Sequence, residues 1–104
     1  MITCTLMLAT ALLECPGLSA PVLVGRATPV GDHTARPAGA AQAIHYADGG
    51  PGLVLALHPV WTPERAALLT QPPAARRLVT DGCINLAPRD FAKLPKTRFR
   101  LIIK

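Results

Sequence analysis

The stretch Asp48-Gly49-Gly50-Pro51-Gly52, followed by Leu53-Val54-Leu55-Ala56-Leu57, decides the fold class of this chain. The first five residues are the strongest turn signal in the sequence, because glycine and proline favour the backbone angles of tight turns. The next five are apolar without alternation, which predicts a strand buried on both faces. A strong turn followed at once by a buried strand indicates a β-sheet protein.

The rest of the sequence predicts short elements joined by turns. Eleven prolines and eight glycines in 104 residues exclude a helical bundle or a coiled coil. Thr62-Pro63-Glu64 is a helix start, since Thr caps, Pro suits the first position and Glu faces the positive end of the helix dipole. We expect strands at 21–24, 44–46 and 98–104, an irregular loop at 25–39, and short helices at 63–70, 74–78 and 88–94. The fold class is therefore mostly β, in one domain with two or three short helices.

The first twenty residues have two open interpretations. They form an N-terminal hairpin with its turn at Pro16-Gly17, or a weak signal-like segment built on the apolar run 6–13. No Lys or Arg precedes that run, so an export signal is weak or missing. The run is also too short to span a bilayer, and we expect no stable membrane insertion. The domain assignment is 1–20 for this segment and 21–104 for the main domain.

Charge and cysteine content narrow the possible partners. The chain has 11 Lys and Arg against 6 Asp and Glu, a net charge of +5, but the basic residues form no continuous run. With only four aromatic residues to stack on bases, we expect no nucleic-acid partner.

Three cysteines make no disulfide framework, and one thiol at least stays unpaired. Cys4 and Cys15 can pair across the hairpin if the chain is exported.

Cys83 and His58 are the residues best suited to chemistry. Cys83 follows a glycine after a turn, a place where a sulfur is presented beside free backbone N–H groups, as an oxyanion hole requires. His58 ends the buried strand and is the candidate base, because a thiol reacts as the thiolate. The alternative stays open at this level: a buried cysteine and a strand-end histidine with structural roles. Cys83, His58 and Asp81 lack the spacing of metal ligands, so no metal or cofactor is expected.

Three segments in order resemble one family. Thr80-Asp81-Gly82-Cys83-Ile84-Asn85-Leu86 resembles the active-site signature of the L,D-transpeptidase (YkuD) family, and Leu57-His58-Pro59-Val60-Trp61 resembles the segment with its histidine. Gly25 to Thr34 resembles its "TP-x-G-x-[FH]-T" loop, and Phe99 to Ile103 its last strand. The resemblance covers about 21–104 and implies an L,D-transpeptidase-like β-sandwich or barrel as the catalytic domain. Two departures are Asp81 in place of the usual histidine and a longer insert at 62–77.

The resemblance implies a cysteine-dependent acyl transfer on peptidoglycan stem peptides, in cell-wall cross-linking or remodelling and cell shape, in a carbapenem-sensitive enzyme of the cell envelope. Cys83 would form the thioester and His58 would move the proton. The Pro59 carbonyl would orient the His58 ring, and the backbone N–H groups of Gly82 and Cys83 would bind the oxyanion. The remaining roles are support of the cysteine loop by Thr80, Asp81 and Asn85, and substrate binding by Arg26, Trp61 and Arg76. We expect a monomer. The alternative is a non-catalytic or truncated domain of the same fold that only binds peptidoglycan.

Overall fold

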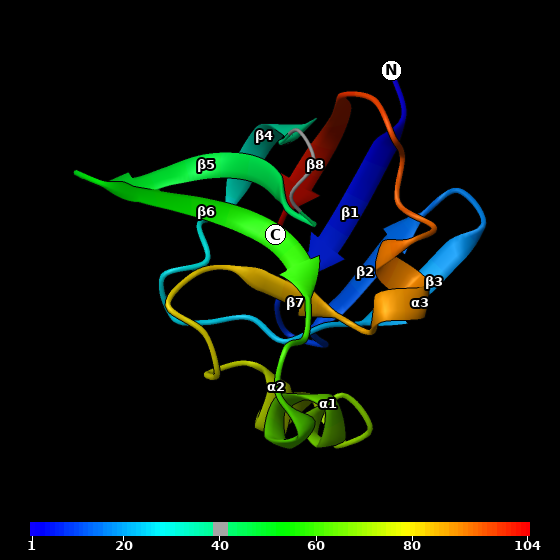
Figure 1. The fold of residues 1–104 in the computed structure, drawn as a ribbon, viewed down its shortest axis with the longest axis vertical. Helices are drawn as coiled ribbons and strands as arrows, with labels where there is room; N and C mark the ends of the chain where they lie inside the picture. The colour runs from blue at the N-terminus through cyan, green and yellow to red at the C-terminus, as the bar shows by residue number, and fades with distance from the viewer. Residues whose placement is uncertain (39–41) are drawn as a thin grey trace.

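The computed structural model describes residues 1–38 and 42–104, which form an eight-stranded curved sheet with three short helices (Figure 1). The strands are β1 (Thr3–Met7), β2 (Leu12–Cys15), β3 (Leu18–Pro21), β4 (Gly31–Pro37), β5 (Ile44–Gly50), β6 (Leu53–Pro59), β7 (Ile84–Leu86) and β8 (Phe99–Ile103). The helices are α1 (Pro63–Leu68), α2 (Pro73–Arg76) and α3 (Pro88–Phe91). The predicted mostly-β class with short helices is confirmed.

The sheet is so strongly curved that the residues after one edge strand, β3, form bridges at the other edge strand, β7. The strand order is β3-β2-β1-β8-β4-β5-β6-β7, with parallel pairs at β1–β8 and β6–β7. Residues after β3 reach the opposite edge, where Leu23 bridges Asn85 of β7 and Gly25 bridges Thr80. The result is a nearly closed sheet. Its far edge, β6 with β7, carries the segments singled out from the sequence.

Alternating burial on β8 shows how the core is built. Phe99, Leu101 and Ile103 are buried, while Arg100 points outward and pairs with Asp32 on β4 at 2.6 Å. The strand predicted at 98–104 is thus confirmed. Apolar residues of β1, β2, β6 and β7 fill the same interior, so the sheet encloses one core. That core fixes the register of β6 against β7.

Several strand predictions were wrong in their bounds. The predicted loop at 25–39 contains β4, whose polar sequence is half solvent-facing and is held by pairing with β8 and β5; Gly39 lies outside the described residues. The predicted strand at 21–24 is an extended segment with an isolated bridge at Leu23. β7 was not predicted. Burial on both faces holds for the second half of β6, whereas Leu53 and Val54 are each 44% exposed.

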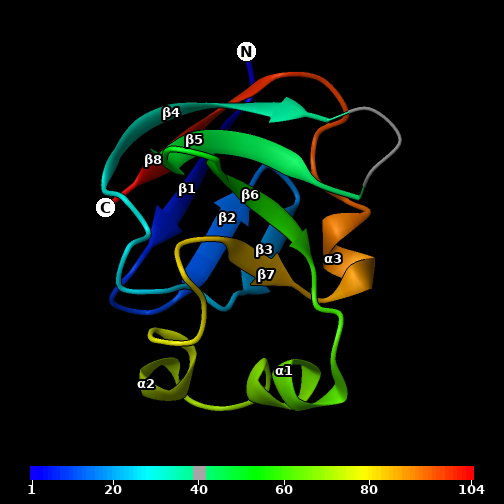
Figure 2. The same cartoon turned by 60° about the vertical axis from the view of Figure 1, so that its left-hand side comes forward.

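α1 and α2 lie at one end of the molecule, below β6 and β7, whereas α3 lies at the side, at the level of β7 (Figures 1 and 2). Thr62 caps α1 as predicted: its hydroxyl oxygen accepts the Arg65 N–H at 3.2 Å. α1 and α2 occupy the insert at 62–77, and α3 lies within the predicted 88–94. Each helix is shorter than predicted. For α1 the reason is that Pro72 and Pro73 follow closely and cannot continue a helix.

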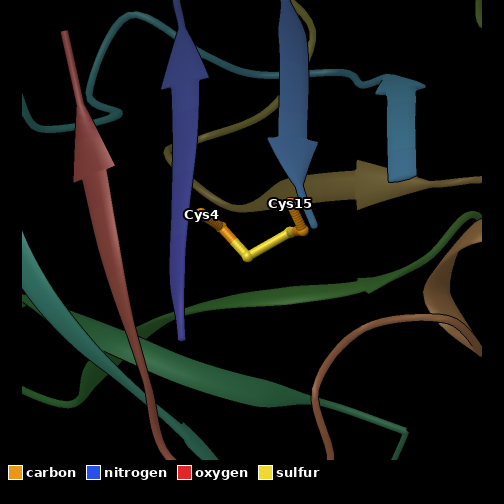
Figure 3. Close-up of a disulfide and its surroundings, with 2 residues drawn as sticks. All are labelled: Cys4 and Cys15. Carbon is orange, nitrogen blue, oxygen red and sulfur yellow. A yellow bond between two sulfur atoms is a disulfide. The ribbon is translucent and has the colours of Figure 1, made fainter. Parts of the chain in front are cut away.

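A disulfide ties β1 to β2. Cys4 and Cys15 face each other across these antiparallel strands, and their sulfur atoms are bonded (Figure 3). The hairpin that brings the two cysteines together turns between residues 8 and 11. The predicted turn at Pro16-Gly17 is present, but it joins β2 to β3. Cys83 is therefore the free thiol. No helix in residues 1–38 or 42–104 has the length and hydropathy needed to cross a membrane.

Candidate active site

A tight turn presents Cys83 at the start of β7. The Thr80 hydroxyl donates to the Cys83 carbonyl at 2.6 Å, and its oxygen accepts the Gly82 N–H at 3.1 Å. One hydroxyl thus closes the turn from both sides, which fits the supporting role expected of Thr80. It also occupies the Gly82 N–H, so the expectation that this group is free for an oxyanion does not match the structure. Within the described chain, the Cys83 N–H has no such bond.

Gly82 is anchored by two buried hydroxyls. Its carbonyl accepts from the Tyr46 hydroxyl at 2.5 Å and from the Thr28 hydroxyl at 3.1 Å. Thr28 in turn accepts the Gly25 N–H at 3.0 Å, which links this loop to the Cys83 turn. Gly82 has φ +128°, and a Cβ there would lie 2.9 Å from a methyl of Leu55. Only glycine therefore fits at this position without strain.

Tyr46 is a site residue that sequence analysis missed. It lies on β5, is 5% exposed, and packs edge-to-face on His33 with ring centroids 5.4 Å apart. Burial raises the pKa of the Tyr46 phenol well above its usual range, and the nearby Cys83 adds to the rise because a thiolate there would repel a phenolate. Tyr46 is therefore a neutral hydrogen-bond donor next to the thiol. Its place inside a predicted strand was the only signal for it.

His58 is held in a fixed orientation at the end of β6. Its ring Nδ1 lies 3.0 Å from the Pro59 carbonyl oxygen, the contact that the resemblance implied. The Trp61 indole stacks on the imidazole, with centroids 4.1 Å apart and planes at 12°. His58 is 7% exposed under this cover, whereas Trp61 is 71% exposed. Trp61 thus covers the imidazole.

Asn85 connects His58 to α1. The parallel register pairs His58 directly with Asn85, which is completely buried. The Asn85 Nδ2 lies 3.2 Å from the His58 Nε2, and its Oδ1 accepts from the Arg65 guanidinium at 2.8 Å. Arg65 is the second residue that sequence analysis missed. Nothing in its local sequence signals a contact that spans twenty residues.

No hydrogen bond of the described residues joins the Cys83 thiol to the His58 imidazole. The Nε2 of His58 has Asn85 as its partner, and Cys83 stands two residues before Asn85, immediately ahead of β7. Such hydrogen bonds are often loose without substrate and tighten only when it binds. Where β6 and β7 pair, the arrangement thus provides a free thiol, an oriented imidazole and one free backbone N–H, the components that an acyl transfer needs.

The other predicted residues divide between the surface and the core. Arg26 and Asp81 are exposed, and Asp81 makes no ion pair with any residue of the described chain. Arg76 contradicts the substrate-binding expectation: it is 7% exposed, and its guanidinium donates to the backbone carbonyls of Gln71, Thr10 and Ala11. No cluster of three His, Cys, Asp or Glu residues suited to a metal occurs in 1–38 and 42–104.

Solved structures similar to this chain include L,D-transpeptidases. An L,D-transpeptidase from Mycobacterium tuberculosis H37Rv superposes with a TM-score of 0.67 at 15% identity, over 99% of this chain and 57% of the other. L,D-transpeptidase 3 from Mycobacterium tuberculosis, in complex with a faropenem-derived adduct, gives 0.68 at 15% identity over 99% and 60%. L,D-transpeptidase 1 from the same organism gives 0.56 at 16% identity over 99% and 62%.

These similarities define the fold as that of L,D-transpeptidases. The chain spans about three-fifths of the length of those structures. No protein-family model and no curated protein matches the sequence. The fold expectation drawn from the three motifs is thus confirmed by structure, at an identity too low for sequence comparison alone.

Proposed function

We propose that this chain is the catalytic domain of an L,D-transpeptidase, which transfers acyl groups between peptidoglycan stem peptides through a Cys83 thioester. The observation that carries the proposal is the free Cys83 thiol on a braced turn that leads into β7, the strand paired with the oriented His58, in a fold shared with L,D-transpeptidases. The disulfide Cys4–Cys15 supports a place in the cell envelope, since disulfides persist in oxidising compartments. Peptidoglycan stems would be its substrates, and we expect it to act as a monomer without cofactor.

The proposed reaction has two steps. His58 accepts the proton from the Cys83 sulfur at Nε2, and the thiolate attacks the carbonyl carbon of the stem amide. The C–N bond breaks, the leaving amine takes the proton from His58, and a thioester to Cys83 remains. An amine of a second stem, or water, then attacks the thioester and restores the thiol.

Local contacts suggest what stabilises each stage. The Cys83 N–H is the available donor for the oxyanion, while the Gly82 N–H serves the turn through Thr80. Asp81 is exposed, so we propose that it faces solvent beside the nucleophile without contacting it. Arg26 is an exposed cation on the loop that braces Gly82, and we propose that it meets a stem carboxylate. Trp61 would flank the bound stem from the His58 side.

The second candidate is a domain of the same fold that binds peptidoglycan without reacting. It is favoured by one observation, the pairing of the His58 Nε2 with Asn85 in place of the thiol. The two candidates differ in whether Cys83 becomes acylated. A β-lactam tests this directly, because its strained carbonyl stands in for the stem amide and no leaving amine departs.

The test is acylation by faropenem and by a carbapenem, followed by peptide mass spectrometry. We expect one adduct per chain, on Cys83 and absent from Cys83→Ala, since Cys4 and Cys15 are already bonded to each other. His58→Gln should slow acylation by about 10²- to 10⁴-fold, the usual contribution of a general base. Iodoacetamide serves as the control for simple thiol accessibility. Alkylation by iodoacetamide without any β-lactam adduct would support the non-catalytic domain.

A further inference from the structure

We propose that the Tyr46 and Thr28 hydroxyls are positioning groups for the oxyanion donor, because they hold the Gly82–Cys83 peptide with its N–H turned away from the core. The bonds of both hydroxyls to the Gly82 carbonyl carry this inference. It deepens the proposed function and rests on it, since an oxyanion forms only if the thiol attacks a carbonyl. It gives two buried side chains a part in the reaction that requires no contact with substrate.

The Gly82 carbonyl and the Cys83 N–H belong to one peptide group. This peptide is planar and trans, so its C=O and N–H bonds point in opposite directions. The carbonyl oxygen points at the hydroxyls of Tyr46 and Thr28, which are each 5% exposed. The N–H therefore points away from these buried groups, and it has no backbone acceptor within residues 1–38 and 42–104.

Both hydroxyls act as donors in these contacts. A carbonyl oxygen only accepts, so the Tyr46 phenol donates to it at 2.5 Å. The Thr28 oxygen already accepts the Gly25 N–H at 3.0 Å, which leaves its proton for the Gly82 carbonyl at 3.1 Å. Because burial raises the pKa of the Tyr46 phenol, this donor keeps its proton at the pH values where a thiol ionises. Two donors on the carbonyl polarise the peptide and make its N–H a stronger donor.

Glycine at position 82 makes this support necessary. The peptide after it turns over by rotation about the ψ of Gly82 and the φ of Cys83, and a residue without a Cβ tolerates both orientations. In the inverted orientation a carbonyl would face the oxyanion and repel it, and both buried hydroxyls would lose their acceptor. The Thr80 hydroxyl bonds to the peptides on either side and leaves this one to Tyr46 and Thr28. These two residues therefore select the orientation that can bind an oxyanion.

The test observes one labelled peptide bond. Gly82–Cys83 is the only glycine–cysteine pair in the sequence, so ¹³C-carbonyl glycine with ¹⁵N-cysteine gives a single coupled amide in the NMR spectrum. Tyr46→Phe and Thr28→Val should each move its carbonyl ¹³C signal upfield, because the oxygen loses a donor, and the double variant should move it most. Thr28→Ser keeps the hydroxyl and should retain the wild-type signal. Thr70→Val removes a hydroxyl–carbonyl bond just after α1 and is the matched control.

Reaction rates provide the second readout. Acylation by faropenem develops an oxyanion and alkylation by iodoacetamide does not, so their ratio separates the oxyanion donor from thiol access and ionisation. If about half to nine-tenths of the peptide turns over, Tyr46→Phe should acylate about two- to tenfold more slowly at an unchanged alkylation rate. The double variant with Thr28→Val should approach the loss of a whole oxyanion donor, about 10²- to 10³-fold. Thr28→Ser and Thr70→Val should keep the wild-type ratio.

Two results would overturn the inference. One is an unmoved carbonyl signal in folded Tyr46→Phe and Thr28→Val proteins. The other is acylation and alkylation that slow together, since a purely structural role of the hydroxyls would affect both reactions. If the double variant does not fold, the single variants decide by the same two readouts. A wild type that forms no β-lactam adduct, with carbonyl signals that move as expected, would refute the proposed function and leave the orientation of the peptide supported.

Discussion

Tyr46 is the only tyrosine of the chain, which makes its buried phenol testable by itself. The perturbation is Tyr46→Phe, which removes the hydroxyl bonded to the Gly82 carbonyl and keeps the ring against His33. At pH 7 the loss is one neutral hydrogen bond, about 0.5–1.5 kcal/mol of unfolding free energy. The lower half of this range is expected, because the Thr28 hydroxyl still donates to the same carbonyl.

Alkaline pH should then reverse the order of stability. The pKa of Tyr46 is raised in the folded protein from its model-compound value of 10.0, first by burial. Above about pH 10 the unfolded chain releases the phenol proton and the folded chain keeps it, so the wild type loses up to about 1.4 kcal/mol per pH unit. Phenylalanine has no proton to lose. The wild type should therefore be the more stable protein at pH 7 and the equal or less stable one at pH 11.

Urea unfolding of both proteins at pH 7 and pH 11 measures this difference. Both carry Cys83→Ser, so that no thiolate attacks the Cys4–Cys15 disulfide at high pH; burial, the main cause of the raised pKa, remains. Tyrosinate absorbance of the Cys83→Ser protein provides the direct check, since it should appear only as the chain unfolds. A difference in stability that is the same at both pH values, or a phenol that ionises in the folded protein, would refute the argument.

Three further changes test single contacts. Arg76→Met should lower the unfolding free energy by about 2–3 kcal/mol because three backbone carbonyls lose a charged donor, whereas exposed Arg26→Met should stay within about 0.5 kcal/mol in the same urea titration. Gly82→Ala should cost about 1–3 kcal/mol through its φ of +128° and the contact with Leu55, and a variant as stable as the wild type would contradict the strain. Trp61→Ala should leave stability nearly unchanged and expose His58, which faster loss of the imidazole to diethyl pyrocarbonate would report.

How far the sequence predicts this protein depends on the range of each contact. β8 and the second half of β6 follow from local patterns, alternation in one and a continuous apolar run in the other. The cap of α1 is equally local, since Thr62 lies three residues from its donor. β4 could not be predicted because its polar residues form a strand only between β8 and β5. Pairing in the sheet, not residue preference, stabilises that strand.

The candidate site shows the same limit at the level of side chains. His58 and its contact with Pro59 are one residue apart and were foreseen through the family resemblance. Tyr46 bonds to a carbonyl 36 residues away, so its role depends on how β5 crosses the Cys83 turn. Arg76 was misassigned because a charged residue is normally exposed. Its guanidinium is instead buried among carbonyls of the β1–β2 turn, a partner that only the folded chain supplies.

The insert between His58 and Cys83 links these observations. In the sequence it looks like a departure from the family pattern that lengthens the distance between the two reactive residues. In the structure Trp61, just before the insert, stacks on the imidazole, and α1 places Arg65 on Asn85, while α2 carries the arginine that holds the β1–β2 turn. Because β6 and β7 are paired in parallel, a connection between them must leave the sheet and return. A crossover that the topology requires is thus also the element that covers and orients the proposed base.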